Sequence, residues 1–447
     1  MDISGNYYKL NPGFLEEDLK ILGSLQSQTF TYFLKYLNPE NGLIADKSSP
    51  DSHSSIAAIG FGICNYVVGV ERNLISREDG IRKVLTILNF FQAGHQGPEV
   101  DAMGYKGFYY HFLDMKSGKR AWSCELSTVD TAIFIAGVLT AAYYFIGENE
   151  DEKNIRALAD SLYRRIDWQW ALNGGTMLTH GWKPESGFLG YHWDQGYSEA
   201  IILYILALGS PTYPIDPVGY RKWTSTFQWD NIGGIDYIHA GPLFIHQMTH
   251  LWIDFHDIRD DVNRKYNIDY FENSRRATQI QQQYAIKNPL NFKHYGKNNW
   301  GFTASDGPGP ASVKIDGVEK IFYDYIARGV PYGPDDGTIS PWAVVASLPF
   351  APDIVLGTIR HAIKRLKERK SLDDGFDASF NPFFRIGSYE ESGWVSPWKF
   401  GLNEGPMVIM IENFQTQLIW NIIKKCKYIT DGLRRAGFTG GWLDQRK

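Results

Sequence analysis

Hydrophobic residues along the chain follow helical periodicity in two alternating patterns. In the first, apolar residues recur three and four positions apart with charged residues between them, as in a helix with one face in water. Segments of this kind are Leu15–Leu37, Arg77–Gly94, Lys153–Leu172, Arg275–Lys287 and Asp353–Lys370, with Pro217–Phe227 as the weakest example. These segments predict an outer layer of six amphipathic helices.

The second pattern is apolar on nearly every side, so helices of this kind should be buried. It covers Ser54–Val70, Ser127–Phe145, Ser198–Leu208, Pro242–Phe255, Thr338–Leu348 and Gly405–Ile423. Outer and inner patterns alternate six times along the chain. Six hairpins, each of one outer and one inner helix, predict an all-α fold: an (α/α)6 barrel, or toroid.

The connections between the predicted helices differ in length. Links from an inner to an outer helix are mostly short, whereas links from an outer to an inner helix are long. The long links are residues 38–53, 95–126, 173–197, 288–337 and 371–404. They should gather on one face, above the N-termini of the inner helices, and long ordered loops usually carry function. Because no linker-like stretch interrupts the pattern, we expect residues 1–447 to form a single domain.

Aromatic residues make up 15% of the 447 residues, including 14 tryptophans. Half of these tryptophans fall in the predicted loops rather than in helices. A single loop tryptophan could simply pack onto the rim of the barrel. As a group, they favour a groove that stacks against the flat faces of sugar rings.

Composition and motifs exclude several other classes. The net charge is −5 and no basic block occurs, so nucleic acid is not expected as a partner. No apolar run approaches the roughly 18 residues of a membrane span, so we expect no membrane insertion. Neither a nucleotide-binding glycine motif nor a GxSxG elbow is present. Three cysteines suggest no disulfide framework, and we expect a monomer.

Carboxylates concentrate where the long loops enter the inner helices. These residues are Asp46, Glu125, Asp130, Asp194, Glu199, Asp335, Asp336 and Glu404. Each could merely cap a helix N-terminus, where negative charge is favoured. Asp130 and Glu199 are harder to explain in this way, because each lies within an apolar segment and an unpaired buried carboxylate is costly.

Two carboxyl groups facing one cavity are the usual machinery of glycoside hydrolysis. One protonates the leaving oxygen, and in inverting enzymes the other activates water across a gap of about 6.5–9.5 Å. Burial raises the pKa of a carboxyl group, which suits a general acid. Acidic residues on different inner helices could therefore form such a pair.

His246 and His250 lie four residues apart, so they share one helix face and could bind a metal ion. The sequence around them is not HExxH, and no third ligand is evident. Core or substrate-binding histidines are the favoured interpretation, and we expect no metal and no cofactor.

Several motifs across the chain match a known family in its order. They are SSIAAIGFG (54–62), GFYYHFLD (107–114), ELSTVDTAIFIAG (125–137), GYSEAIILYILALGSPTYP (196–214), PLFIHQMTHLWIDF (242–255), NNWGFTASDGP (298–308), DGTISPWAVVASLPFAP (336–352) and GLNEGPMVIMIENF (401–414). On these motifs the chain resembles the glycoamylase-like domain family. That family includes the β-1,2-glucanases of glycoside hydrolase family 144, and a similar domain occurs in cyclic β-1,2-glucan synthases.

The resemblance implies an (α/α)6 barrel and an inverting glycoside hydrolase acting on β-linked glucan, above all β-1,2-glucan or its oligosaccharides. Glu199, in the YSEA motif, matches the family's best catalytic candidate, and Asp130 matches a second acidic position. Many relatives read Asp-Gln where this chain has Asn403-Glu404, which moves the acid by one residue. Starch is not implied, because the "glucoamylase" label rests on fold similarity.

Location is left open by the sequence. The resemblance implies a periplasmic or secreted protein. The first residues, MDISGNYYKL, lack the charged and apolar regions of a signal peptide.

Taken together, these considerations assign Glu199 as general acid. Asp130 or Glu125 is expected to be the base or to orient the water, with Glu404 in reserve. Tryptophans would line sugar subsites, while histidine and arginine side chains would contact hydroxyl groups. The expected substrate-binding residues are Asp46, His111, Arg120, Trp122, Trp182, Trp193, Asp194, His246, Tyr332, Asp336 and Trp394.

Two alternatives from other classes stay open. A polysaccharide lyase or sugar epimerase on the same barrel would use His246 or a tyrosine as base. A glycan-binding protein without catalysis would keep the tryptophan-lined groove but lack a working pair of carboxylates.

Overall fold

The structure is a computed structural model that describes residues 16–315, 317–368, 375–386 and 393–445. The N-terminal residues, on which the expectation about a signal peptide depends, lie outside the described residues. The same holds for the first position of the predicted helix Leu15–Leu37 and for residues 369–370 of the last predicted outer helix.

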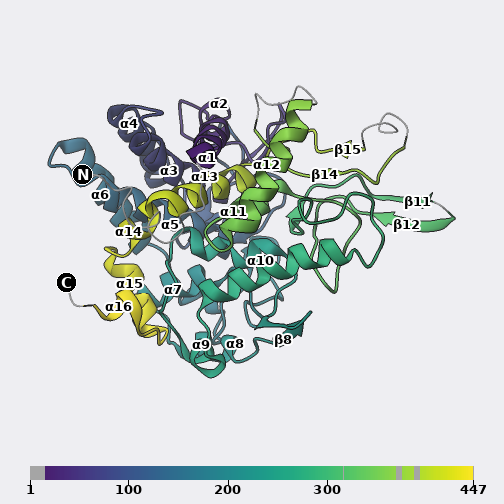
Figure 1. The fold of residues 1–447 in the computed structure, drawn as a ribbon. Helices are drawn as coiled ribbons and strands as arrows, with labels where there is room; N and C mark the ends of the chain where they lie inside the picture. The colour runs from purple at the N-terminus through teal and green to yellow at the C-terminus, as the bar shows by residue number, and fades with distance from the viewer. Residues whose placement is uncertain (1–15, 316, 369–374, 387–392, 446–447) are drawn as a thin grey trace.

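An inner ring of helical segments forms the centre of the fold (Figure 1). Its members are α3 (Ile56–Glu71), α5 (Thr128–Tyr144), α7 (Ile201–Gly209), the 3-10 helices η2 (Leu243–His246) and η3 (Met248–Leu251), α11 (Pro341–Ala346) and α13 (Gly401–Thr416). One continuous cluster of buried apolar side chains extends through it, from Leu22 to Leu443.

Contacts run round this ring in sequence order and return to its start. α3 packs against α5, and α5 against α7. The Thr249 hydroxyl donates to the Glu199 carbonyl beside α7 (3.1 Å), and the Gln247 amide donates to the Ala343 carbonyl of α11 (2.6 Å). α11 packs against α13, which packs against α3. The predicted helical barrel is thereby confirmed.

Outer helices surround the ring in the predicted alternation. They are α1 (Glu16–Phe30), α4 (Arg77–Ala93), α6 (Glu150–Arg164), α8 (Val218–Thr224), α10 (Tyr270–Lys287) and α12 (Pro352–Glu368). The hydrophobic pattern explains their position. α6 buries a single stripe that includes Ile155, Ala159 and Leu162, whereas inner helix α3 is buried at every position from Ile56 to Gly69.

Shorter helices complete the described part of the chain. α2 (Tyr32–Lys35), η1 (Trp170–Leu172) and α14 (Leu418–Ile423) are pieces of segments that the sequence predicted as continuous helices. The break before α14 falls at Gln417, which has a left-handed φ of 60°. α9 (Asp261–Tyr266), α15 (Lys427–Arg435) and α16 (Gly441–Asp444) were not predicted.

The prediction of one helix over Pro242–Phe255 is wrong. η2 and η3 are two short 3-10 turns, and neighbouring side chains donate to two of their backbone carbonyls. Ser274 donates to the His246 carbonyl (2.7 Å), and Trp420 donates to the His250 carbonyl (2.6 Å). The fourth wall of the ring is therefore held by side chains of neighbouring elements as well as by its own backbone hydrogen bonds.

The connections between the helices contain short antiparallel strands that the sequence analysis did not predict. These are β1 (Ser54–Ser55), β2 (Gly104–Tyr105), β3 (Phe108–Tyr110), β4 (Phe112–Leu113), β5 (Leu126–Ser127), β6 (Gly181–Lys183), β7 (Gly187–Phe188), β8 (Trp229–Ile232), β9 (Ile235–Ile238), β10 (Ala304–Ser305), β11 (Ala311–Ile315), β12 (Val318–Phe322), β13 (Ile326–Ala327), β14 (Phe380–Asn381) and β15 (Trp394–Val395).

Some of these strands pair between different loops. β1 pairs with β4, and β5 pairs with β6 within a five-stranded sheet of order β2-β3-β5-β6-β7. These pairings join the loops to one another where they cover the barrel. In Figure 1, β11, β12, β14 and β15 lie at the right, while α14, α15 and α16 lie at the left.

The contact between α3 and α5 depends on two glycines. A Cβ atom added to Gly60 would lie 2.6 Å from the Ile133 carbonyl oxygen, and one added to Gly137 would lie 2.2 Å from the Gly60 carbonyl oxygen. The two backbones therefore touch directly.

We expect Gly60→Ala to lower the free energy of unfolding by about 1–3 kcal/mol, because the helices must separate to admit the methyl group. Gly23→Ala in α1 is the control: nothing lies within 4 Å of its added Cβ, and helix propensity alone should stabilise it by up to about 1 kcal/mol. Thermal unfolding of both variants measures the difference. Equal unfolding temperatures for Gly60→Ala and wild type would contradict the close contact.

Candidate active site

A cleft of about 820 Å³ opens where the long loops meet the inner ring. Charged and polar side chains line one part of it: Asp46, Lys47, Asp51, His53, His111, Glu125, Asp130, His180, Glu199, Asp306, Asp324 and Asn403. Aromatic side chains also line it: Phe112, Trp122, Trp193, Phe244, Tyr325, Trp342 and Phe400. A hollow of this size can hold several sugar rings.

Glu199 lies in the turn just before α7, not within the helix as its sequence pattern predicted. It is partly buried and lines the cleft. Burial raises the pKa of Glu199 to about 7, and the nearby Asp130 carboxylate adds to this shift. A large fraction of Glu199 is therefore protonated at neutral pH, as a general acid must be.

Asp130 lies in the first turn of α5, where Ser127 caps the helix. The Ser127 hydroxyl accepts from the Asp130 backbone N–H (3.2 Å) and donates to Asp130 Oδ2 (2.5 Å). The SxxD spacing thus fixes both the helix start and the carboxylate. Asp130 also lines the cleft.

His111 lies between two carboxylates. Its Nδ1 is 2.8 Å from Glu125 Oε1, and its Nε2 is 3.8 Å from Asp130 Oδ2. Burial alone would lower the pKa of His111, but Asp130, Glu125 and Asp46 together raise it to about 9. The hydrogen bond from His111 in turn lowers the pKa of Glu125 to about 2. At neutral pH the pair is therefore an imidazolium and a carboxylate.

Further carboxylates face the same space. Burial raises the pKa of Asp46 to about 6. Asp306 and Asp324 also line the cleft, and burial raises the pKa of Asp306. Sequence reasoning missed both residues, although Asp306 lies in the family-like stretch TASDGP. Tyr325, which also lines the cleft, was missed as well because nothing local distinguishes it from other loop tyrosines.

Two of the expected tryptophans form walls of the cleft. Trp122 is 67% exposed, has a left-handed φ of 52°, and packs edge-on against His53 with 4.5 Å between ring centroids. Trp193 stacks on His180 at 3.9 Å, and its Nε1 donates to the Thr128 hydroxyl (3.1 Å). Both rings can offer a flat face to a sugar.

Other expected site residues do not line the cleft. They are Arg120, Trp182, Asp194, His246, Tyr332, Asp336, Trp394 and Glu404. Glu404 is buried, next to Asn403, which does reach the cleft, and burial raises the pKa of Glu404 to about 7. Asp194 is partly buried in its loop, where its carbonyl accepts from the Thr226 hydroxyl (3.5 Å).

Two of these charged residues form ion pairs within the loops instead. Asp336 is buried and bound by Arg328, with 2.8 Å between Arg328 Nε and Asp336 Oδ1. Arg120 forms two hydrogen bonds with Glu185, the shorter being 2.5 Å. Asp336 and Arg120 therefore stabilise the loops through these ion pairs.

Two of the expected tryptophans pack inside the loop layer. The rings of Trp182 and Trp170 are 5.9 Å apart, and Trp394 belongs to a separate buried cluster with Phe322. Their burial is the ordinary outcome for a loop tryptophan, and the sequence offered no way to distinguish them from Trp122 and Trp193.

The last two expected residues also lie elsewhere. Tyr332 is 71% exposed, and its hydroxyl donates to Asp230 (2.8 Å). His246 is buried, with its Nε2 3.1 Å from the Ala240 carbonyl oxygen. Burial lowers the pKa of His246 to about 4, so it is a neutral core histidine.

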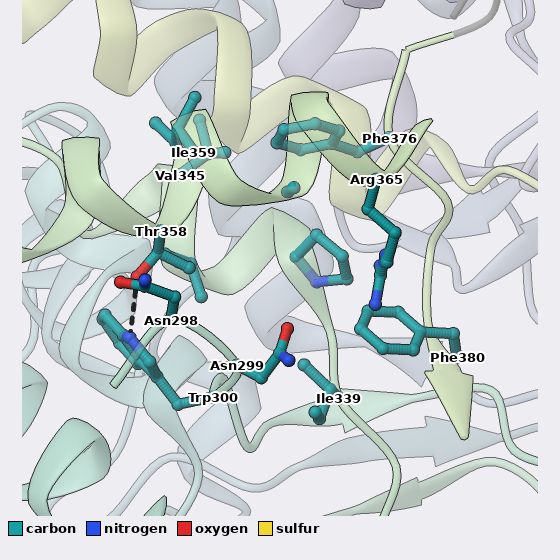
Figure 2. A pocket seen from close by; sticks show the side chains of 13 residues that line it. Asn298, Asn299, Trp300, Ile339, Val345, Thr358, Ile359, Arg365, Phe376 and Phe380 are labelled. Carbon is teal, nitrogen blue, oxygen red and sulfur yellow. Dashed lines mark hydrogen bonds between the residues drawn. The ribbon is translucent and has the colours of Figure 1, made fainter. Parts of the chain in front are cut away.

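A second, smaller pocket lies beside α11 and α12 (Figure 2). The Trp300 indole N–H donates to the Thr358 hydroxyl (2.9 Å), and the Arg365 guanidinium lies 3.7 Å from the Phe380 ring centroid. Its volume is about 20 Å³, roughly the space for one water molecule. Of these two pockets, only the cleft can take a sugar.

In the described parts of the chain, no group of three or more histidine, cysteine, aspartate or glutamate side chains could hold a metal ion. None of the described helices is both long and apolar enough to cross a lipid bilayer.

The chain is similar in sequence and structure to several known proteins. The crystal structure of a "putative glucoamylase" from Bacteroides uniformis has 30% sequence identity and a TM-score of 0.84, covering 96% of this chain and 100% of that one. The endo-β-1,2-glucanase from Chitinophaga pinensis, in complex with sophorotriose and glucose, has 27% identity and a TM-score of 0.82, covering 95% of this chain and 99% of that one.

An exo β-1,2-glucooligosaccharide sophorohydrolase (non-reducing end) from Parabacteroides distasonis is 29% identical over an alignment of 453 positions, which covers 94% of this chain. The chain spans 58% of the length of that curated relative. The glycoamylase family model, described as "Putative glucoamylase", matches residues 190–427, which is more than half of the chain. The chain therefore belongs to the glycoamylase family.

Proposed function

We propose that this protein is a glycoside hydrolase that cleaves β-1,2-linked glucan or its oligosaccharides with inversion at the anomeric carbon. The observation that carries the proposal is the pairing of Glu199, whose pKa is about 7, with the neighbouring Asp130 carboxylate in one cleft. The names of the Chitinophaga pinensis and Parabacteroides distasonis relatives support the choice of linkage.

In this proposal Glu199 donates its proton to the glycosidic oxygen as the bond to the anomeric carbon breaks. A water molecule attacks that carbon from the opposite side, and Asp130 accepts a proton from it. Asp130 then releases its proton to solvent, and Glu199 takes one up from solvent, which restores both groups.

Asp130 is a better candidate for the base than Glu125. Glu125 is held 2.8 Å from His111, and this hydrogen bond lowers its pKa to about 2. A carboxylate stabilised to that extent is a weak base at neutral pH. We therefore assign Glu125 a supporting role.

This chain has Asn403-Glu404 where many relatives have Asp-Gln, and this difference is consistent with Asp130 as the base. Asn403 lines the cleft, whereas Glu404 is buried outside its lining. An amide cannot accept the proton of the attacking water, but it can hydrogen-bond to that water or to a sugar hydroxyl. We propose that Asn403 hydrogen-bonds to the attacking water or to a sugar hydroxyl, and that Glu404 takes no part in the reaction.

Trp122 should form a sugar subsite. We expect Trp122→Ala to raise KM about tenfold, the equivalent of ~1.4 kcal/mol of lost stacking. Its exposed ring contributes little to the core, so thermal unfolding should not change. Trp122→Tyr, which keeps a flat ring, is the control, and steady-state kinetics on short β-1,2-oligosaccharides gives the measurement. An unchanged KM for the alanine variant would remove Trp122 from the binding site.

The proposed function is tested by incubation with linear β-1,2-glucan, in parallel with β-1,3-glucan and starch. Chromatography identifies the products, and NMR follows their anomeric form before mutarotation. Short β-1,2 products that appear first as the α-anomer are the expected result. Products from another glucan alone would overturn the substrate, and a first-formed β-anomer would overturn inversion.

The same experiment distinguishes the remaining alternatives. An unsaturated product absorbing in the ultraviolet would indicate a lyase, and an isomerised sugar would indicate an epimerase. Saturable glucan binding without products would indicate a binding protein.

A further inference from the structure

His111 differs from the other histidines that line the cleft. His53 packs against Trp122, and His180 stacks on Trp193, so both make aromatic contacts. His111 also stacks on an aromatic ring, that of Phe112, with 4.1 Å between ring centroids and 10° between planes. Unlike the other two, it has a carboxylate at each of its ring nitrogens.

The charges around His111 come from three separate parts of the fold. Glu125 precedes strand β5, Asp130 lies in the first turn of α5, and Asp46 lies in the first long loop. The positive charges of Lys183 and Lys47 also act on this group, Lys183 on Glu125 and Lys47 on Asp46. His111 is therefore the cation at the centre of a group of three carboxylates.

This arrangement leaves little of the imidazole for binding sugar. Nδ1 is engaged by Glu125 at 2.8 Å, and Nε2 points toward Asp130 at 3.8 Å. A neutral histidine would also keep one nitrogen as a hydrogen-bond acceptor, which gains nothing when both neighbours are carboxylates. The surroundings thus select the doubly protonated ring.

We propose that His111 is a positioning residue whose fixed positive charge keeps Asp130 ionised for its reaction with water, with Glu125 holding the imidazolium in place. This inference rests on the proposed function, since it gives Asp130 the role of base. It also replaces the earlier expectation that His111 contacts sugar hydroxyls.

The physical need for such a charge follows from the site itself. Hydrolysis requires Glu199 protonated and Asp130 ionised at the same pH, although both face one cleft. The charge on Asp130 raises the pKa of Asp46 and of Glu199, so the negative charges in this part of the cleft repel one another. The imidazolium offsets this repulsion, and Glu125 keeps the proton on Nδ1.

The first test is the pH profile of kcat in the His111→Gln variant. The acidic limb, where the base becomes protonated, should move up by about one pH unit or more, with a smaller change in KM. His111→Lys, which restores a positive charge, should move the limb back toward its wild-type position. His180→Gln is the matched control: it removes a cleft histidine that stacks on Trp193, and its acidic limb should stay in place.

The second test follows the His111 ring proton by NMR and needs no substrate. In wild type it should titrate with a pKa of about 9, and Glu125→Gln should lower that pKa because a neighbouring negative charge is lost. An ordinary value in wild type, or an unmoved acidic limb in His111→Gln, would overturn the inference. If no glucan is cleaved but His111 titrates as expected, the proposed function fails while the charge cluster stands.

Discussion

Replacing Glu199 with glutamine should lower kcat by roughly 10²–10⁴-fold while the protein stays folded, because the leaving oxygen loses its proton donor. Glutamine keeps the shape of the side chain but has no proton to give. Steady-state kinetics on β-1,2-oligosaccharides measures the loss, and thermal unfolding verifies the fold. Turnover near the wild-type value would exclude Glu199 from the mechanism.

The pH dependence gives an independent check on the same residue. Glu199 must be protonated to act, and its pKa is about 7, so wild-type activity should fall as the pH rises above that value. The residual activity of Glu199→Gln should lack this alkaline limb.

Glu404 supplies a matched control, because it is a second glutamate whose pKa burial raises to about 7. It lies outside the cleft lining. Glu404→Gln should therefore keep the alkaline limb and lose far less turnover than Glu199→Gln. The opposite result would transfer the role of acid to Glu404.

Removing the carboxylate of Asp336 should lower the free energy of unfolding by about 3–5 kcal/mol, because it leaves a buried guanidinium without its counter-ion. Arg328 donates to both oxygens of Asp336, and also to the carbonyls of Ser305, Tyr323 and Asp324. This one side chain therefore ties together several turns of the loop that covers residues 288–337.

The pKa of Asp336 gives the pH dependence of this contribution. Burial alone would raise that pKa, but Arg328 lowers it below the usual range overall. The stabilisation is thus complete above the unfolded-state pKa and is lost as the pH falls through the lowered, folded-state value. Asp336→Ala should differ less from wild type in acid than at neutral pH.

A double variant separates the ion pair from the packing around it. Arg328→Met combined with Asp336→Leu removes both charges and should be less destabilised than Asp336→Ala, since no buried charge stays unpaired. Urea unfolding compares the variants. Activity should fall in Asp336→Ala as well, because the same loop carries Asp306 and Tyr325 into the cleft. Wild-type stability for Asp336→Ala would show that the pair has no structural role.

The ring of helices could be predicted because the burial of a helix determines its pattern of apolar and polar residues. A segment buried on all sides, such as Ile56–Gly69, has no polar stripe, and a segment buried on one side has apolar residues three and four apart. The two-residue strands are too short to show a hydrophobic pattern, and they depend on pairing between distant loops. The 3-10 turns at His246 are contacted by distant donors such as Ser274, which the local sequence does not contain.

The candidate site was predictable where a residue type conflicted with its surroundings. Asp130 and Glu199 stood out as acids in apolar segments, and both line the cleft. The sequence around Trp182 and Asp336 does not indicate in which direction their side chains point. Asp336 looked like a ligand for sugar because its true partner, Arg328, lies in a loop whose path only the structure reveals.

The pairing of β1 with β4 and of β5 with β6 means that the walls of the cleft are not independent modules. A loop transplanted from a relative would arrive without the strand that its neighbour needs, and an unmatched strand edge exposes unpaired backbone groups. Divergence of specificity in this protein is therefore constrained to proceed either by single side chains within the cleft or by concerted change of adjoining loops. Attempts to redesign its substrate preference face the same choice.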